Sequence, residues 1–149
     1  MGAEQTVPYQ LALLAEAYGI GDLADEGMTV VIEALAIAHK NQECCYIAEL
    51  YRLKGELLLQ SRVQGLESGI SNPHVAEAEA CFHQALAVAR RQQAKSFELR
   101  AALSLSRLWQ QQGKRQEARD LLTPIYNWFT EGFDTADLRE ARTLLDELG

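Results

Sequence analysis

The sequence has 149 residues, of which 48% are hydrophobic and 23% charged, as in an ordinary globular domain. We interpret residues 1–149 as one domain, long enough to bury a core. No apolar run reaches the roughly 20 residues of a membrane-spanning helix, so no membrane partner is expected. The N-terminal segment MGAEQTVPYQ lacks the basic and apolar regions of a secretory signal. Three cysteines, an odd number, do not suggest a disulfide framework, and we predict a cytoplasmic location.

The net charge of −7 is unevenly distributed along the chain. Residues 90–119 contain eight Lys and Arg against two Glu, a balance of +6, which leaves −13 for the remainder. Two interpretations stay open: solvated helices with basic ends, or a docking face for an acidic partner. We do not expect nucleic-acid binding, because the overall charge is negative and Trp109, the aromatic beside these cations, takes a core position.

Apolar residues recur at the spacing of helices, and glycine, asparagine and proline mark the breaks. The pattern predicts three helical hairpins at about residues 8–40, 43–93 and 95–130, followed by a capping helix at about 134–148. Within the second hairpin, residues 61–73 have no periodicity and contain two glycines, so we predict a long loop there. Pro124 either kinks the last helix of the third hairpin or shifts the start of its regular part.

The third hairpin has the order of small and large residues of a tetratricopeptide repeat. Its first helix carries Ser106 and Trp109, a turn follows at Gly113, and its second helix carries Ala118, Leu122 and Ile125. Small residues let antiparallel helices approach closely, and large ones fill the space between them. The matching small residues of the first helices, at 15, 55 and 106, lie 40 and 51 residues apart, and the 11 extra residues correspond to the predicted loop. We therefore predict an all-α fold, an α-α superhelix of tetratricopeptide-like hairpins.

Three stretches also resemble a known family. They are YRLKGELLLQ, the run AEAEACFHQALAVARRQQAKSFELRAALSLSRLWQQQGKRQEARDLL, and the closing WFTEGFDTADLREARTLLDELG. They are similar to the C-terminal tetratricopeptide region of large bacterial multidomain signalling proteins. In those proteins a class III adenylate/guanylate cyclase or a DNA-binding domain is joined to a predicted ATPase module. The resemblance implies a scaffold or sensor segment and carries over no catalytic residue. The chain departs from the family in the longer loop at 61–73.

No nucleotide-binding loop, nucleophile elbow or zinc-protease motif occurs in the sequence. The cysteines and histidines match no zinc spacing; they are Cys44, Cys45, Cys81, His39, His74 and His83. We therefore predict no enzyme activity, no metal and no cofactor. The favoured function is protein–protein interaction or intramolecular scaffolding, because a helical repeat offers a continuous surface. The alternative is a small-molecule sensor segment that regulates an attached ATPase or nucleotide cyclase.

A partner-binding groove is predicted on the first helices of the hairpins. Its expected residues are Arg100, Leu103, Arg107, Gln110 and Gln111 in the third hairpin, Glu49, Arg52 and Glu56 in the second, and Tyr9 and Glu16 in the first. We expect the two arginines of the third hairpin to be exposed, so that exchanging them for glutamate leaves stability almost unchanged. The competing interpretation is a helix face that is merely solvated. The expected partner is a protein, a peptide or another domain of a parent protein, and self-association stays open.

Overall fold

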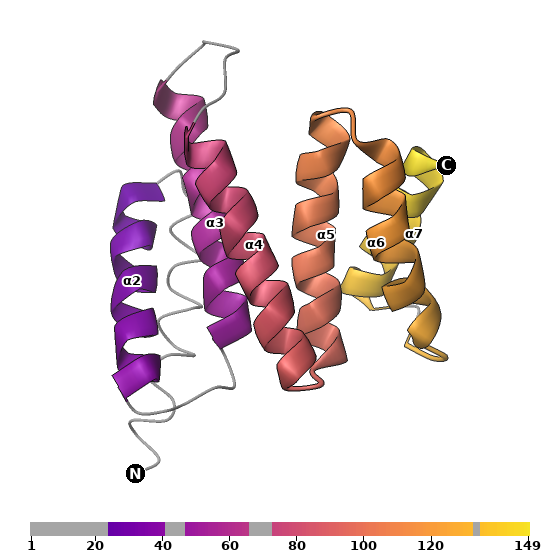
Figure 1. Cartoon of the computed structure of the whole chain (residues 1–149), viewed down its shortest axis with the longest axis horizontal. Helices are drawn as coiled ribbons and strands as arrows, with labels where there is room; N and C mark the ends of the chain where they lie inside the picture. Colours follow the sequence, from indigo (N-terminus) through magenta and orange to yellow (C-terminus); the bar gives the residue numbers. More distant parts are fainter. Residues whose placement is uncertain (1–23, 41–46, 66–72, 133–134) are drawn as a thin grey trace.

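The computed structural model describes residues 24–40, 47–65, 73–132 and 135–149 of the chain (Figure 1). This described part forms six helices and no strand, which confirms the all-α prediction. Residues 8–23 of the first predicted hairpin lie outside it. The six helices are α2 (Ala24–Lys40), α3 (Ile47–Gly65), α4 (Pro73–Arg91), α5 (Lys95–Gln111), α6 (Arg115–Trp128) and α7 (Ala136–Leu148).

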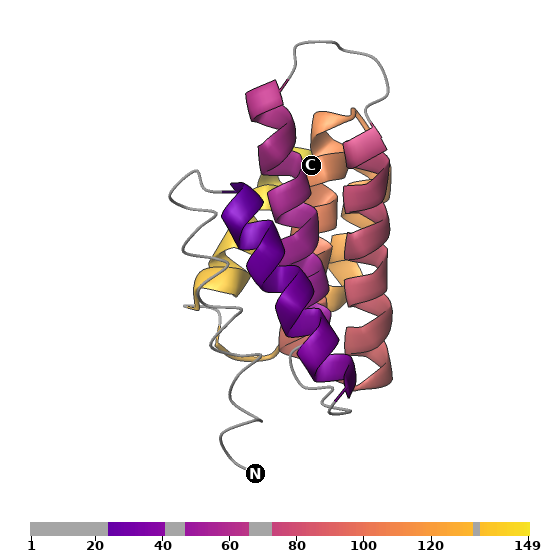
Figure 2. The same cartoon turned by 90° about the vertical axis from the view of Figure 1, so that its left-hand side faces the viewer.

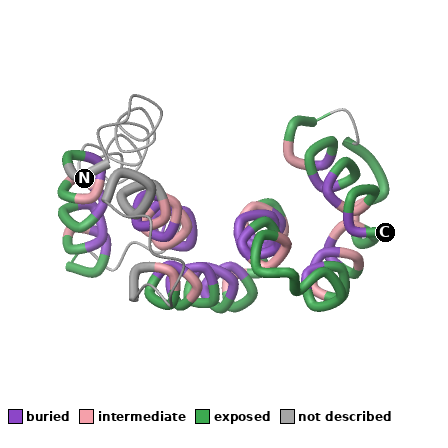
Figure 3. Tube along the Cα trace, turned by 90° about the horizontal axis from the view of Figure 1, so that it is seen from above, coloured by how far each residue is buried: buried purple, intermediate pink, exposed green. Residues whose placement is uncertain are grey.

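The helices form two staggered rows when seen from above (Figure 3). Each helix packs against the next one along the chain, from α2 through α7. In addition, α5 packs against both α3 and α7, whereas α4 and α6 have no contact with each other in the described part. The first row therefore consists of α3, α5 and α7, and the second row contains α4 and α6. Figure 2, viewed from the α2 end, shows α3 and α4 behind α2.

Apolar side chains from facing helices fill the core in two clusters. One cluster runs from α3 to α7, and the other joins α2, α3 and the C-terminal part of α4. Phe82 is fully buried, and the last helix, at the position of the predicted capping helix, contributes an apolar stripe: Leu138, Ala141, Leu144 and Leu148 are buried. Positions on the outer side of α7, including Arg142 and Asp146, are exposed. These polar positions suit a helix that covers the end of the apolar core.

Two small residues allow the close helix approach predicted from the repeat spacing. The Ser106 hydroxyl donates a hydrogen bond of 3.3 Å to the Ala118 carbonyl, which ties α5 directly to the backbone of α6. At Gly55 in α3, a Cβ atom would lie 2.5 Å from Cε1 of Phe82 in α4. The Phe82 ring thus occupies the space that any other side chain at position 55 would need.

The turns from α4 to α5 and from α5 to α6 have the same geometry. In the first, the Ala94 amide donates to the Ala89 carbonyl at 2.9 Å, and Gln93 has a φ of +56°. In the second, the Lys114 amide donates to the Trp109 carbonyl at 2.8 Å, and Gly113 has a φ of +82°. Both are Schellman ends, which satisfy the last helical carbonyls through a left-handed residue. Glycine adopts that conformation without strain, whereas glutamine at 93 is unusual there.

The C-terminal end of α3 differs from the sequence-based prediction. A loop is predicted at 61–73, but α3 continues to Gly65, so the first part of that segment is helical. This prediction was wrong because aperiodic polar residues can extend a helix that is already nucleated, each adding one backbone hydrogen bond. Residues 66–72 lie outside the described residues.

α6 is continuous through Pro124 to Trp128, and Pro124 is exposed, so its ring projects outside the core.

We predict that Gly55→Ala lowers the free energy of unfolding by about 1–3 kcal/mol, because the new methyl group would overlap the Phe82 ring. In an uncrowded helix interior the same exchange would stabilise by about 1 kcal/mol. Urea denaturation followed by circular dichroism measures the change. Phe82→Leu should partly relieve the overlap, so the double variant should lose less stability than the two single losses combined. Additive losses would contradict the assigned contact.

Candidate functional site

The predicted groove residues fall into three groups in the structure. Tyr9 and Glu16 lie outside the described residues. Arg107 and Gln111 are exposed on α5, and Gln110 beside them is half-buried. The remaining five lie where α3 faces α5 or close by: Glu49, Arg52, Glu56, Arg100 and Leu103.

Two of these five positions correct the sequence-based interpretation. Leu103 is 2% exposed and Glu49 is 7% exposed, so neither offers a surface to a partner. Both are buried because α3 packs directly on α5. The predicted groove residues of these two helices therefore face each other and not the solvent. Polar residue type alone had suggested exposure, but long charged side chains can be buried when they are paired.

Charged side chains join all three helices of the first row. The Glu49 carboxylate accepts two hydrogen bonds from Arg52, at 2.8 Å from Nε and 3.0 Å from Nη2. It also forms an ion pair with Arg100 of α5, and Arg100 Nε lies 3.8 Å from a carboxylate oxygen of Asp137 in α7. Arg52 further reaches the Ser104 hydroxyl at 3.5 Å. We call Glu49, Arg52, Arg100 and Asp137 the first-row ion cluster.

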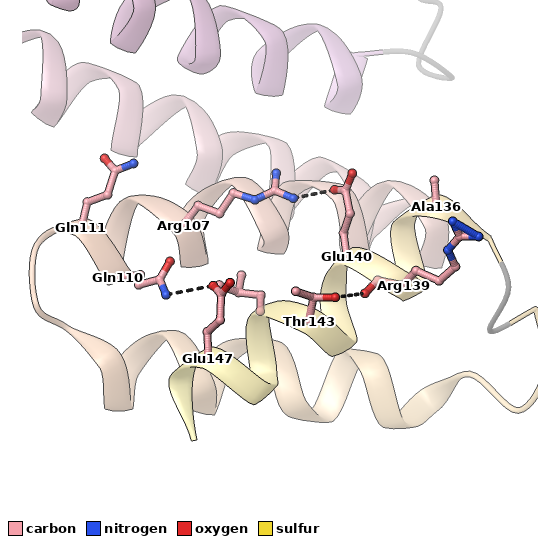
Figure 4. A pocket seen from close by; sticks show the side chains of 9 residues that line it. Arg107, Gln110, Gln111, Ala136, Arg139, Glu140, Thr143 and Glu147 are labelled. Carbon is pink, nitrogen blue, oxygen red and sulfur yellow. Dashed lines mark hydrogen bonds and ion pairs between the residues drawn. The ribbon is translucent and has the colours of Figure 1, made fainter.

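A groove lies between α5 and α7 at the far end of the first row (Figure 4). Its volume is about 530 Å³. The wall from α5 contains three of the predicted residues, Arg107, Gln110 and Gln111. The wall from α7 contains Ala136, Arg139, Glu140, Thr143, Leu144 and Glu147.

Hydrogen bonds and ion pairs hold the side chains of this groove in place. Arg107 Nη2 lies 2.5 Å from a carboxylate oxygen of Glu140, and the Gln110 amide donates to Glu147 at 3.3 Å. Both contacts bridge α5 and α7, and Figure 4 shows them side by side. The Thr143 hydroxyl donates to the Arg139 carbonyl at 3.0 Å within α7. The lining has two cations and two carboxylates, so it offers both donors and acceptors without a dominant charge.

The α7 wall was not predicted as part of the groove. The apolar residues of 134–148 predict only that this helix caps the repeat. Its polar residues Arg139, Glu140, Thr143 and Glu147 also share one side of the helix, at spacings of one, three and four. This polar stripe indicates that α7 has a second face suited to a binding surface. The sequence alone does not say which helix that face lies against.

Cys81, Glu79 and His83 are side chains of chemically reactive types in the described helices. Cys81 is buried, and burial raises the pKa of its thiol; Lys54 lowers the pKa and Glu77 raises it, both to a smaller degree. The thiol is therefore held in its protonated form, which is not nucleophilic. Glu79 is 4.0 Å from His83 and accepts a 2.7 Å hydrogen bond from the Trp109 indole, so it ties α4 to α5.

The described helices contain neither a cluster of metal ligands nor a membrane-spanning segment. Among these residues no three His, Cys, Asp or Glu side chains gather closely enough to hold a metal ion. None of the helices in the described ranges combines the length and apolar character needed to cross a bilayer.

No protein-family model matches the sequence, and comparison with curated proteins gives no significant match. The groove and the arrangement of the helices are therefore the features of the chain that bear on its function.

We predict that the two arginines differ strongly in their effect on stability. Arg100→Glu would place a carboxylate against the buried Glu49 and lower the free energy of unfolding by about 2–3 kcal/mol. This value is below that of a fully buried pair because Arg100 is 31% exposed and Arg52 still pairs with Glu49. Arg107→Glu should cost no more than about 1 kcal/mol, because its pair with Glu140 is exposed.

Urea denaturation of the two single variants measures the difference. Arg100→Gln serves as the control for charge repulsion, since it removes the cation without adding an anion. Equal losses for Arg100→Glu and Arg107→Glu would contradict the role assigned to the first-row ion cluster.

Proposed function

We propose that this chain is a non-catalytic, tetratricopeptide-like repeat that binds a protein or peptide in the groove between α5 and α7. The observation that carries the proposal is the groove itself, which combines ordered polar side chains from two first-row helices. Such a surface suits an extended chain segment, whose backbone amides and carbonyls need both donors and acceptors.

The helix arrangement supports the repeat assignment. In the third hairpin α5 contacts α6 and also the first-row helices on either side of it, α3 and α7. Repeat proteins are built from such nearest-neighbour contacts between hairpins. The small residues Gly55 and Ser106 correspond in the repeat spacing of the sequence, and each lies against the second helix of its own hairpin.

The sequence resemblance suggests the kind of protein in which this module works. We propose that it acts as a scaffold within a bacterial signalling protein, where its partner is another domain of that protein or a separate protein. An enzymatic role has no support in the buried thiol of Cys81 or in the Glu79–His83 pair.

We predict that Gln111→Trp weakens the binding of peptides selected on this chain from a random peptide library. Gln111 is exposed and lines the groove, so an indole there would fill space that the peptide needs. The expected loss of affinity is at least about tenfold, equivalent to about 1.4 kcal/mol. Fluorescence anisotropy with labelled peptides measures it.

Gln112→Trp provides the matched control. It makes the same exchange at the neighbouring exposed residue, which does not line the groove. Affinity for the selected peptides should stay within about twofold of the parent chain. The proposal fails if no peptide is selected, or if the two tryptophan variants behave alike.

One observation favours the alternative, a small-molecule sensor. A smaller pocket of about 330 Å³ lies where α2, α3 and α4 meet, and Ile47 and Val88 give it an apolar wall. His39, Tyr51 and Arg91 add polar groups, with the Tyr51 hydroxyl 3.5 Å from His39 Nε2. A small anion with an apolar body would fit this combination.

If this pocket binds a ligand, a thermal-shift screen of nucleotides, sugar phosphates and carboxylic acids should raise the melting temperature of the chain. At a hundredfold excess over Kd the stabilisation would be about 2.7 kcal/mol. Arg91→Gln should remove the shift, while Arg119→Gln, at an exposed cation on α6, should retain it. A screen without any shift, or a shift that survives Arg91→Gln, would contradict the sensor function.

A further inference from the structure

Trp128 is the most exposed large hydrophobic side chain in the described part of the chain, at 58%. Two neighbouring side chains nevertheless contact its ring. The Lys95 ammonium lies 5.4 Å from the centre of its ring, and the Phe129 ring meets it edge-on at 5.2 Å between centroids. Such contacts restrict an exposed indole before binding and so reduce the side-chain entropy that binding costs, and tryptophan is enriched at interface hot spots.

Two cations beside Trp128 share one carboxylate. Arg90 Nε lies 3.1 Å from one oxygen of Glu98, and Lys95 Nζ lies 3.2 Å from the other. The Glu98 side chain is 7% exposed, whereas those of Arg90 and Lys95 are 54% and 34% exposed. The negative charge is therefore covered and the positive charges face solvent, with one unit of positive charge in excess.

These residues line a pocket of about 580 Å³, formed by Arg90, Gln93, Lys95, Glu98 and Trp128. It lies between the ends of α4 and α6, which do not contact each other, and Glu98 of α5 forms its floor. The N-terminus of α5 is at the same place and adds positive potential, since its cap residue Ala94 supplies no side-chain acceptor. No residue of this pocket lines the groove between α5 and α7.

We propose that this pocket is a second docking surface, and that its occupant is an acidic peptide segment carrying an aromatic side chain beside a carboxylate. The aromatic side chain would stack against Trp128, and the carboxylate would pair with Arg90 and Lys95. Charge complementarity selects this occupant, because the pocket is positive on a chain whose net charge is −7. A basic segment would be repelled locally, and an uncharged one would leave the excess cation unpaired.

The test follows Trp128 fluorescence in a Trp109→Phe background, where Trp128 is the remaining indole of the two in the chain. The probe is a blocked peptide in which glutamates alternate with phenylalanines. Matched peptides replace each glutamate by lysine or each phenylalanine by alanine. The acidic aromatic peptide should shift the Trp128 emission in a saturable manner. Increasing the salt concentration should lower the affinity of the peptide. Both matched peptides should bind at least about tenfold more weakly.

Three variants test the residues. Trp128→Ala should weaken binding about thirtyfold, as at an aromatic hot spot, measured by calorimetry with the same peptide. Glu98→Gln should instead strengthen binding severalfold, because it frees both cations while keeping the size of the side chain. Arg119→Gln removes an exposed cation of α6 that does not line the pocket and should leave affinity unchanged. Circular dichroism verifies that each variant is folded.

Four results would overturn the proposal. They are unchanged binding by Trp128→Ala, equal binding of the lysine-containing peptide, a response to phosphatidylserine vesicles but not to peptide, and a Trp128-dependent dimer in sedimentation without peptide binding. Gln111→Trp, which blocks the other groove, should not affect this binding. A failure here is therefore distinguishable from a failure of the proposed function.

Discussion

Burial of the Glu49 carboxylate determines how the helices of the first row face one another. A carboxylate that is almost removed from water needs compensating partners, and Glu49 obtains them from Arg52 on its own helix and Arg100 on the next. Arg100 then extends the connection to Asp137 of α7. Polar contacts between helices depend on geometry more than apolar contacts do, so this cluster fixes the relative positions of α3, α5 and α7. The groove between α5 and α7 lies along the same two helices that Arg100 and Asp137 connect.

The second row is held differently. Because α4 and α6 do not touch, side chains of α5 form the surface between them. Glu98 lies there in place of an apolar residue, and two cations cover it. Helix α5 thus supplies residues to the groove beside α7 in the first row and Glu98 to the pocket between α4 and α6 in the second row. The central position of α5 explains why so many of its residues are buried. Between Glu98 and Leu108, nine residues are buried, and Arg100 and Arg107 are the exceptions.

The sequence predicted well what depends on local spacing. The apolar stripe of α7 and the close approaches at Gly55 and Ser106 follow from which residues share a helix face, and the structure confirms them. Pairing between helices distant in the chain could not be predicted in the same way. Glu49 and Arg100 are polar residues whose burial depends on meeting each other, and residue type alone suggested exposure. The α7 wall was missed for a related reason, since its polar stripe becomes part of a groove only through the angle at which α7 packs on α5.

The contact pattern also bears on how the chain gains and loses structure. Every helix contact in the described part joins helices that are neighbours or next neighbours along the chain. Contacts of such short sequence separation close with little loss of chain entropy, which favours rapid folding. They also allow opening to begin at an end, because losing α7 leaves the contacts among α2, α3 and α4 intact. Amide hydrogens of α5, which touches four other helices, should consequently exchange more slowly than those of α7.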